Sequence, residues 1–566
     1  MNKIPKFFLL LTIAFSLFLN VIAQTDIKEP LPNGWYLKDQ KETGIFGISL
    51  DKAYQFVKNK KSKLVIVAVI DGGVDTLHED LKEILWHNPK EIPGNGIDDD
   101  KNGYVDDIYG WNFLGGKDGR NVTVESLERD RVYHQYKSRY EGKSINPDSL
   151  SKDELPLYEM WKKAKDELFK DDGEGGLDLA LMKMAYQNMT KTDSILQKAL
   201  GKTVYTGKEL EKFTPAEDRL KRAKEALLEM MEATGGLETS NKEFNEGFRD
   251  YLDQEQRKAD AKEKAPKNFR DEIVKDNYND ISDRYYGNNN VFVDDKAAFH
   301  GTHVTGIIGA KRNNKIGIDG VADNVKIMMI RAVPDGDEHD KDIALAIRYA
   351  VDNGAQVINM SFGKYFSPEK KWVDEAIQYA QSKSVLLVSA AGNEAFNADS
   401  IIHFPEKKLN NGKIVTNWIS VGASGDLSID QYMSDGTIYH SLPAYFSNYG
   451  KDDVDVFAPG MKIYSTITGG NAYGNAQGTS MASPVVAGMA ALILSYYPTL
   501  SAEQVKYAIE KSAVAPLYKV NIPGTEKVVN MSDLCKSGGV VNAYEAIKLA
   551  ATLKGERGTG NNLKPF

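Results

Sequence analysis

The sequence predicts an α/β fold: a doubly wound, mostly parallel sheet with an inserted α-helical subdomain. Residues 64–70 form a continuous run of apolar, largely β-branched residues, as in a strand buried on both faces of a parallel sheet. Strand-like and helix-like segments then alternate, which is typical of βαβ units with right-handed crossovers. These segments are 325–333, 340–352, 357–361, 369–382 and 385–390. Between these two regions, residues 121–285 are rich in Lys and Glu, with helical spacing of apolar residues.

Length and composition restrict the class of protein. A chain of 566 residues exceeds what one core usually holds, so a second domain or a large insertion is expected. Hydrophobic residues make up 42% and charged residues 27%, which is ordinary for a globular protein. The net charge of −9 disfavours binding to nucleic acid or to an anionic membrane. The single cysteine, Cys535, excludes an intramolecular disulfide and fits no metal–thiolate site.

The first 23 residues have the features of a secretory signal peptide. Lys3 and Lys6 supply a charged start, residues 7–19 are apolar, and small or modest residues end at Ala23. A retained membrane anchor is the alternative, but the apolar run is short for a bilayer span. We therefore expect an exported protein, periplasmic or extracellular, with no membrane span after signal removal.

The next segment, residues 24–63, is polar and leads into the strand 64–70. Asp71 follows this strand directly, at the carboxyl end where open α/β sheets place their sites. Two glycines, Gly72 and Gly73, come next, and taken alone this pattern is equally typical of a turn. The position of Asp71 makes it a candidate functional residue.

A serine is presented near the C-terminal end of the chain. Ser480 follows Gly478-Thr479 and precedes an apolar helix-like run at 485–494. Small residues let a substrate backbone approach closely, and a helix N-terminus favours negative charge beside the hydroxyl. Because a serine hydroxyl is a weak nucleophile alone, it needs a positioned base. An isolated Gly-Thr-Ser is more simply interpreted as a helix cap.

Three motifs in one order decide between these interpretations. Asp71-Gly72-Gly73, His300-Gly301-Thr302-His303 and Gly478-Thr479-Ser480 resemble those of the subtilisin-like serine proteases (subtilases), whose triad runs Asp, His, Ser. The resemblance implies that Ser480 attacks the scissile carbonyl, that His300 carries the proton and that Asp71 orients the imidazole. The family more often has serine or threonine after the aspartate, so Gly72 removes a possible hydrogen bond.

The resemblance also assigns roles at two strand ends. Asn393 is expected to donate its side-chain amide to the tetrahedral oxyanion, together with the Ser480 backbone N–H. An edge segment is expected to pair with extended substrate. The residues expected beside the substrate are Ser361, Phe362, Gly363, Ala391 and Gly392. His403 falls where the family lines its primary specificity pocket; a loop histidine with no role is the alternative.

Two structural calcium sites are predicted, and no redox or nucleotide cofactor is expected. The first is an Asp-x-Asp-x-Asn-Gly pattern of alternating oxygen ligands, although Tyr109 replaces the bidentate glutamate of an EF-hand. A solvated acidic turn is the alternative there. The second site is implied by the family resemblance. The first set is Asp98, Asp100 and Asn102, and the second is Asp80 and Asn314 through side chains with Ile316 and Ile318 through carbonyls.

Residues 121–285 match no part of the subtilase pattern and are predicted to be an inserted helical subdomain. Leu157, Trp161, Ala164 and Leu168 form an apolar stripe. The segment 214–217 reads as a capping box with proline at the first helical position. The simpler interpretation is that this insertion packs against the peptidase domain without a role in catalysis. The alternative is a lid or a substrate-recruiting arm beside the cleft.

The predicted organisation is a signal peptide (1–23), a discontinuous peptidase domain (24–120 and 286–550), the insertion (121–285) and a disordered tail (551–566). The predicted function is a secreted serine endopeptidase that cleaves protein or peptide substrates through an acyl-enzyme. A catalytically silent scaffold that binds peptides is one alternative. An esterase or lipase is the other, but it requires Gly-x-Ser-x-Gly and the order Ser, Asp, His, which this chain lacks.

Overall fold

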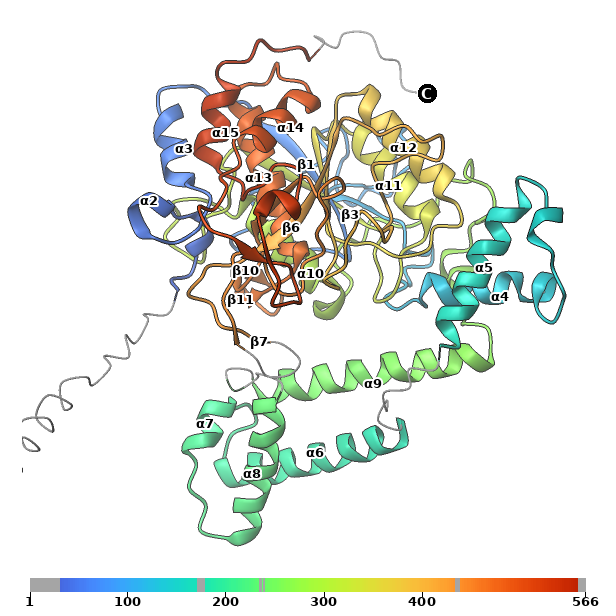
Figure 1. The fold of residues 1–566 in the computed structure, drawn as a ribbon, viewed down its shortest axis with the longest axis vertical. Coiled ribbons are helices and arrows are strands. Elements are labelled where there is room, and N and C mark those ends of the chain that lie inside the picture. The colour runs from blue at the N-terminus through green and yellow to red at the C-terminus, as the bar shows by residue number, and fades with distance from the viewer. Residues whose placement is uncertain (1–30, 171–178, 234–236, 238–239, 433–437, 558–566) are drawn as a thin grey trace, which may run out of the picture.

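The computed structural model describes residues 31–170, 179–233, 237, 240–432 and 438–557 (Figure 1). The predicted signal peptide lies outside the described residues, as does the tail from residue 558. The prediction of a disordered tail does not hold at Arg557. Its backbone N–H donates to Thr499 O at 2.8 Å and its Nε donates to Leu500 O at 3.0 Å, so this part of the tail is fastened to the domain.

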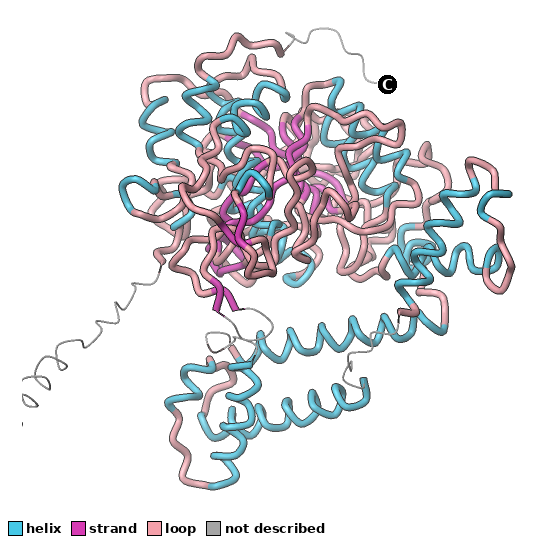
Figure 2. Tube along the Cα trace, viewed as in Figure 1, coloured by secondary structure: helices cyan, strands magenta, loops and turns pink. Residues whose placement is uncertain are grey.

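A seven-stranded sheet organises the molecule, and every neighbouring pair within it is parallel. The strand order is β2-β3-β1-β4-β5-β6-β9. Figure 2 shows these strands gathered at the centre of the main body with helices around them. The strands are β1 (Val65–Asp71), β2 (Gly110–Asn112), β3 (Val325–Arg331), β4 (Val357–Met360), β5 (Leu386–Ala390), β6 (Trp418–Ser424) and β9 (Val456–Pro459).

Helices cover both faces of the sheet, which confirms the doubly wound prediction. Val67 and Val69 of β1 point into one core and Ala68 and Ile70 into the other, because successive side chains of a strand face opposite sides. The first core contains α3 (Leu50–Val57), α10 (Asp295–Gly309), α13 (Thr479–Tyr496), α14 (Ala502–Lys511) and α15 (Ala543–Ala550). The second contains α11 (Asp340–Asp352) and α12 (Lys370–Ser382).

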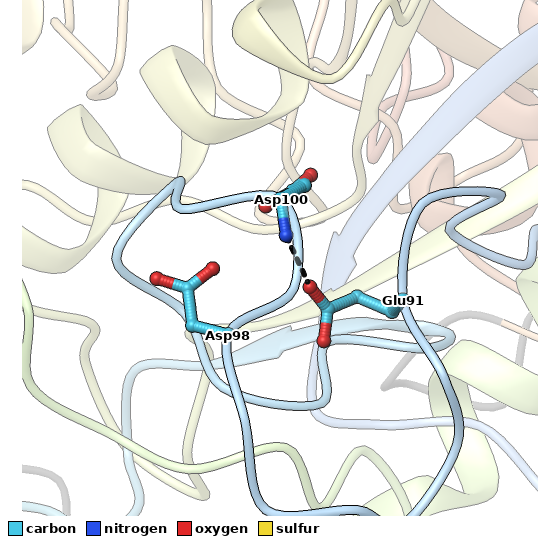
Figure 3. Close-up of side chains that lie close together, drawn as sticks. All are labelled: Glu91, Asp98 and Asp100. Atoms are coloured by element: carbon cyan, nitrogen blue, oxygen red, sulfur yellow. Dashed lines mark hydrogen bonds between the residues drawn. The ribbon is translucent and has the colours of Figure 1, made fainter.

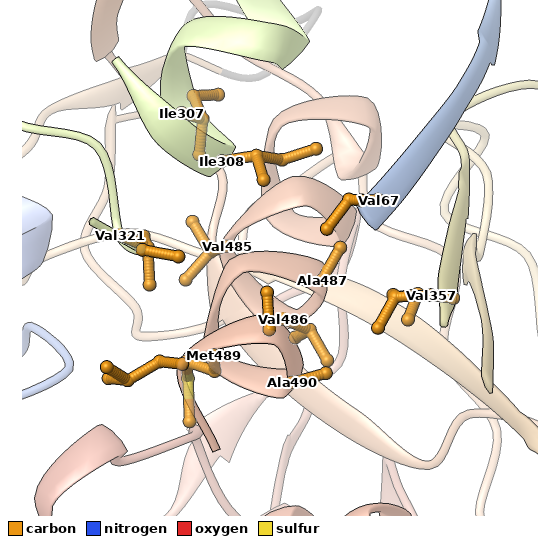
Figure 4. Close-up of a cluster of buried hydrophobic side chains, with 14 of the residues drawn as sticks. Val67, Ile307, Ile308, Val321, Val357, Val485, Val486, Ala487, Met489 and Ala490 are labelled. Atoms are coloured by element: carbon orange, nitrogen blue, oxygen red, sulfur yellow. The ribbon is translucent and has the colours of Figure 1, made fainter. Parts of the chain in front are cut away.

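Helix α13 runs through the middle of the first core. Figure 4 shows Val485 and Val486 of α13 in one cluster with Ile307 and Ile308 of α10 and Val67 of the sheet. Among the described residues, α13 is the one helix long and apolar enough to cross a bilayer, yet 89% of it is buried inside the domain. A helix that is apolar all round is what a core position requires.

The insertion leaves and re-enters the domain at adjacent points. Asn112, at the end of β2, pairs with Asn288 in both directions through backbone hydrogen bonds of 2.9 and 3.1 Å. The Trp111 indole N–H donates to Tyr286 O at 2.8 Å. The two ends therefore lie side by side, and the intervening residues can form a separate body without disturbing the sheet.

The insertion is helical and has two parts, as Figures 1 and 2 show. Its elements are α4 (Glu128–Tyr140), η2 (Pro147–Ser149), α5 (Glu154–Leu168), α6 (Leu179–Leu200), α7 (Gly207–Lys212), α8 (Asp218–Ala233), α9 (Asn241–Glu263) and η3 (Arg270–Val274). Helices α4 and α5 pack against Phe366 of the main domain. Helices α6 to α8 and the start of α9 form a second cluster of their own, which we call the distal arm.

The sequence located the helix α5 correctly but misplaced a helix start. Trp161, Ala164 and Leu168 of its predicted stripe are buried. The capping box predicted at 214–217 is wrong, because α8 begins only at Asp218. The capping box in this region is formed instead at α7, between Thr206 and Glu209.

The remaining elements are short and lie around the sheet. They are η1 (Trp35–Leu37), α2 (Gln40–Thr43), β7 (Gln431–Tyr432), β8 (Ile438–Tyr439), β10 (Ile463–Ile467), β11 (Ala472–Ala476), β12 (Val520–Asn521), β13 (Val528–Val529) and η4 (Met531–Asp533). The β10–β11 hairpin supports α10, since Thr466 Oγ1 donates to Thr302 O at 2.8 Å.

Candidate active site

The end of β1 and the start of α10 bring Asp71 and His300 into contact. His300 Nδ1 lies 2.8 Å from Asp71 Oδ2 and 3.0 Å from Oδ1, and the Asp71 side chain is only 3% exposed. A Cβ at Gly301 would lie 2.1 Å from Gly73 O, so glycine is needed beside His300 for this close approach. Such a pair can hold one imidazole tautomer in place.

The structure explains the glycine that follows Asp71. The backbone N–H of Gly72 donates to Asp71 Oδ1 at 2.7 Å, so the carboxylate gains a hydrogen bond without a side chain at this position. A Cβ at Gly72 would lie 2.5 Å from Ala297 O. Serine or threonine therefore has no room here beside the first turn of α10.

The two histidines of the His-Gly-Thr-His motif have opposite electrostatics. Burial by itself lowers the pKa of His300, but the charge and hydrogen bond of Asp71 outweigh it, and the pKa is raised. Burial lowers the pKa of His303 to about 4. Its Nε2 lies 2.9 Å from Ile463 O, so His303 is a neutral donor that ties α10 to β10.

Ser480 lies in the first turn of α13. Its Oγ donates to Ser361 O at 3.1 Å, and Ser361 Oγ donates in return to Ser480 O at 2.9 Å. Within the described chain, no hydrogen bond joins Ser480 to His300. Ser480 is thus hydrogen-bonded to Ser361, which lines the same pocket as Asp71 and His300. Catalytic hydrogen bonds often tighten only when substrate binds.

Asn393 follows β5 and is oriented by Thr479, a residue that the sequence analysis did not single out. Asn393 Oδ1 accepts from the Thr479 backbone N–H at 2.8 Å and from Thr479 Oγ1 at 3.0 Å. Thr479 Oγ1 also accepts from the Gly392 N–H at 3.1 Å. With its oxygen engaged, Asn393 is left with its Nδ2 amide, which makes no hydrogen bond to any described residue. The position of Thr479 directly before Ser480 was the available signal.

The predicted substrate edge follows β4. The backbone groups of Phe362 and Gly363 make no hydrogen bonds to other described segments, as an edge that accepts a peptide requires. The predicted substrate contacts Ala391 and Gly392 already use their N–H groups inside the domain, toward Val421 O and Thr479 Oγ1. Their carbonyls are also engaged, because Asn448 donates to both from its Nδ2 and its backbone N–H.

His403 lies directly on the substrate edge. A Cβ at Gly363 would lie 1.9 Å from His403 Cε1, so the imidazole occupies the space beside this glycine. Tyr365 contacts the same ring edge-on, with centroids 5.4 Å apart. Burial lowers the pKa of His403 despite the nearby Glu394. The structure thus places His403 where a neutral ring limits the room beside Gly363.

A pocket of about 370 Å³ opens beside the Asp71–His300 pair. Its lining combines the catalytic candidates with the start of the insertion. The lining includes Asp71, His300, Ser361, Val333, Thr123 and Val124. Because the backbone of Glu125 also donates to Asp335 O at 2.8 Å, the insertion begins as part of the wall of this pocket.

The predicted calcium loop brings three carboxylates together. One oxygen each from Glu91, Asp98 and Asp100 lies within 4.8 Å of the other two (Figure 3). Glu91 Oε1 also accepts from the Asp100 N–H at 3.1 Å. Hard carboxylate oxygens suit Ca²⁺, so the set fits the ion. The predicted ligand Asn102 instead uses its oxygen for the Tyr104 N–H at 2.8 Å. Glu91 was missed because it lies outside the motif.

The second predicted calcium site is a contact between Asp80 and the loop 313–318. Asn314 Nδ2 donates to Asp80 Oδ1 at 2.6 Å, and the Ile318 N–H and Tyr473 hydroxyl approach Oδ2 at 3.4 and 3.3 Å. Ile316 contributes its N–H to Asn314 Oδ1 at 3.1 Å. The predicted residues are neighbours, but donors rather than carbonyls face the carboxylate. Calcium at this site stays a prediction.

Comparison with known proteins agrees with the fold. The sequence profile of the subtilase family (Peptidase_S8) matches residues 62–544. The chain belongs to the subtilase family. The match runs across the insertion and includes both strand ends and the first turn of α13 described above.

Individual subtilases match a smaller part of the chain. The thermophilic serine proteinase of Bacillus sp. (strain AK1) is 43% identical over 215 residues, which is 38% of this chain and 46% of that protein. Subtilisin DY of Bacillus licheniformis is 37% identical over 216 residues, or 38% of this chain and 70% of that protein. The chain thus spans about half the length of the first of these relatives.

Proposed function

We propose that this subtilase is a secreted serine endopeptidase that uses Asp71, His300 and Ser480. The observation that carries this proposal is the 2.8 Å contact between His300 Nδ1 and Asp71 Oδ2, in a pocket whose lining residue Ser361 is hydrogen-bonded to Ser480. Family membership supports the same chemistry. The substrates are protein or peptide chains, since the open edge at Phe362 and Gly363 suits an extended backbone of any sequence.

Acylation begins when the Ser480 hydroxyl leaves Ser361 O and turns to His300 Nε2. Oγ attacks the scissile carbonyl carbon while Nε2 takes its proton, and Asp71 stabilises the imidazolium through Nδ1–H. The carbonyl oxygen becomes an oxyanion that accepts from Asn393 Nδ2 and the Ser480 N–H. His300 then gives its proton to the leaving amine as the peptide bond breaks.

In deacylation, water takes the place of the serine as the nucleophile. Water attacks the ester carbon of the acyl-enzyme, His300 takes a proton from the water, and the same donors hold the second oxyanion. The bond to Ser480 Oγ breaks, the carboxylic acid leaves, and His300 returns the proton to the serine. Peptide and water are the reactants, and two shorter chains are the products.

The proposal includes a structural calcium ion and an exported protein. Glu91, Asp98 and Asp100 would hold the ion and thereby fasten the loop before β2. The signal-like residues 1–23 direct the chain to the periplasm or the cell exterior. The peptidase domain comprises 24–120 and 286–550, with 121–285 as the insertion; the isolated β-bridge between Asn112 and Asn288 supports these boundaries.

The test is casein hydrolysis by the chain that starts at Gln24, beside Ser480→Ala. Ser495→Ala is the matched control, because Ser495 is a buried serine at the other end of α13. We expect activity in the wild type and in Ser495→Ala and a fall of about 10⁶-fold in kcat for Ser480→Ala, a magnitude measured in subtilisin, a relative. Unchanged circular dichroism and thermal melting would show that the loss is chemical.

One observation favours the silent-scaffold alternative: Ser480 Oγ donates to Ser361 O rather than to His300. On that alternative, the folded wild type binds peptides but does not cleave casein, and Ser480→Ala behaves like the wild type. Equal residual activity in both proteins would also reject Ser480 as the nucleophile.

A further inference from the structure

A buried ion pair near the substrate edge joins that edge to the insertion. The Lys364 side chain directly follows Gly363 and is 2% exposed. Its Nζ donates to Glu128 Oε2 at 2.7 Å and to the Glu338 backbone O at 2.7 Å, and it lies 2.8 Å from Asp340 Oδ1. Three acceptors satisfy the three N–H donors of an ammonium group.

Glu128 reaches this position from the first turn of α4, inside the insertion. Its side chain is 4% exposed, and Arg131 approaches both carboxylate oxygens, at 3.2 and 2.7 Å. The Glu128 N–H donates to Asp337 Oδ2 at 2.7 Å, which fixes the start of α4 on the segment after β3. Burial alone would raise the pKa of Glu128, but Arg131 and Lys364 hold it well below its usual range.

The backbone of Lys364 links this ion pair to both sides of the substrate edge. On one side it is covalently next to Gly363. On the other, its N–H and C=O both pair with Phe404, at 2.9 and 2.8 Å, and Phe404 follows the His403 ring that lies on Gly363. A shift of Lys364 therefore moves the edge and the loop that faces it together.

We propose that Glu128 is a positioning residue for substrate binding: by holding Lys364, the insertion fixes the edge that pairs with the peptide. This proposal rests on the proposed peptidase function and refines it. Without the Glu128 charge, Asp340 is the one acceptor of this buried ammonium that keeps a negative charge, and the lysine gains by moving toward water. The edge then loses its fixed geometry, whereas Asp71, His300 and Ser480 do not contact Glu128 and keep theirs.

Substrate length separates this role from general stability. A tetrapeptide anilide has four residues before the scissile bond that can pair with the edge, whereas a single-residue acyl amino acid ester has only one. In Glu128→Gln we expect KM for the tetrapeptide to rise about fivefold or more, with kcat changed less than about twofold. Ester hydrolysis stays within about twofold of the wild type.

The matched control is Glu154→Gln, which removes a carboxylate from the same insertion. Glu154 pairs with Arg139 at 2.6 Å on the exposed side of α4 and α5, away from the edge, so both substrates should behave as in the wild type. Glu128→Asp keeps the charge but has a shorter side chain, and it serves as a second test if Glu128→Gln does not fold. It should show the same selective defect in smaller measure.

Parallel losses on tetrapeptide and ester would overturn the proposal, because they indicate a purely structural role. No change on either substrate would overturn it as well. A wild type that cleaves neither substrate instead rejects the peptidase function. Calorimetric titration of the tetrapeptide into Ser480→Ala, with and without Glu128→Gln, then decides the positioning role: we expect about fivefold weaker binding with the second change, and equal binding refutes it.

Discussion

At the scale of single residues, the Asp71–His300 pair determines the pH range in which the catalytic base is neutral. Asp71 raises the pKa of His300, and a general base must be unprotonated to accept a proton. The kcat/KM of the wild type should therefore fall on the acid side with an apparent pKa above 6.5, the ordinary value for histidine.

Replacing the carboxylate tests this dependence. Asp71→Asn removes the charge that raises the pKa of His300, so the acid limb of the kcat/KM profile should shift to lower pH. The rate at the optimum should drop by about 10⁴-fold, because the tautomer is no longer held. A pH profile from 4 to 10 on one peptide measures both effects; an acid limb that stays in place would contradict the assignment of His300 as base.

Glu338 supplies a second residue-scale prediction, about stability. Its Oε1 is buried and has no hydrogen-bond partner among the described residues, and burial raises its pKa to about 8. A carboxyl with a raised pKa carries no penalty below its unfolded pKa near 4.5. The penalty grows as the pH rises toward 8, because the folded state must then hold a buried charge.

Glu338→Gln removes this ionisation while keeping the shape of the side chain. We expect the variant to be more stable than the wild type by roughly 3 to 5 kcal/mol at pH 9 and nearly equal at pH 5. Urea unfolding at the two pH values measures the difference. A gain of the same size at both would mean that ionisation of Glu338 is not the cause.

At the scale of elements, we predict that calcium bound by the loop with Glu91, Asp98 and Asp100 stabilises the folded protein. An ion bound at a hundred times its Kd adds about 2.7 kcal/mol to the stability of the folded state. Chelator should therefore lower the melting temperature of the wild type, and added calcium should restore it. In Glu91→Gln/Asp98→Asn the melting temperature should be low already and should not respond to either reagent.

Asp80→Asn separates the two predicted calcium sites. If the loop around Asp98 holds the stabilising ion, Asp80→Asn keeps the response to chelator. Loss of the response in Asp80→Asn, with its retention in Glu91→Gln/Asp98→Asn, would place the ion at Asp80 and reject the Asp98 loop.

The elements of the parallel sheet were the most predictable part of the chain. The predicted helix 340–352 coincides with α11, and the predicted strand 385–390 starts one residue before β5. Buried apolar runs and amphipathic periodicity are local signals, so they can be recognised without knowledge of the tertiary fold. The predicted start of α8 is wrong because a capping pattern alone does not say at which residue the helix begins.

The functional residues also divide into those that the sequence predicts and those that only the structure shows. Asp71, His300 and Ser480 lie in motifs that the sequence shows directly, at the end of β1, in α10 and in the first turn of α13. Thr479, Glu91 and Glu128 were not identified by function from the sequence. Glu91 lies close in the chain to Asp98 and Asp100 but outside their motif. The roles of Thr479 and Glu128 depend on partners distant in the chain, as Glu128 and Lys364 illustrate, separated by 236 positions. Only the folded chain shows such a pair.

At the scale of the whole molecule, the distal arm is a folding unit with its own core. Its buried residues are Met189, Leu196, Tyr205, Leu210, Leu227 and Met231, and none belongs to the clusters of the main domain. Helix α9 is connected to the main domain by ion pairs such as Lys296–Asp250, at 2.8 Å, whose groups are substantially exposed. Exposed pairs contribute little stability.

We therefore expect calorimetry to show two transitions, with the distal arm unfolding first. Leu196→Ala in the arm should lower only the first transition, by about 2 to 5 kcal/mol in stability. Leu387→Ala in β5 is the matched control and should lower only the second. A single transition that both variants shift would show that the arm and the main domain unfold as one unit.

The measurement that tests the central claim most directly is covalent labelling of the active serine. A fluorophosphonate probe loses fluoride when an activated serine Oγ attacks its phosphorus, and the adduct is located by peptide mass spectrometry. We predict one adduct per chain, on Ser480, which is absent in Ser480→Ala and formed far more slowly in His300→Ala. Labelling elsewhere, or an unlabelled Ser480 in the folded wild type, would contradict the account of this chain as a serine peptidase.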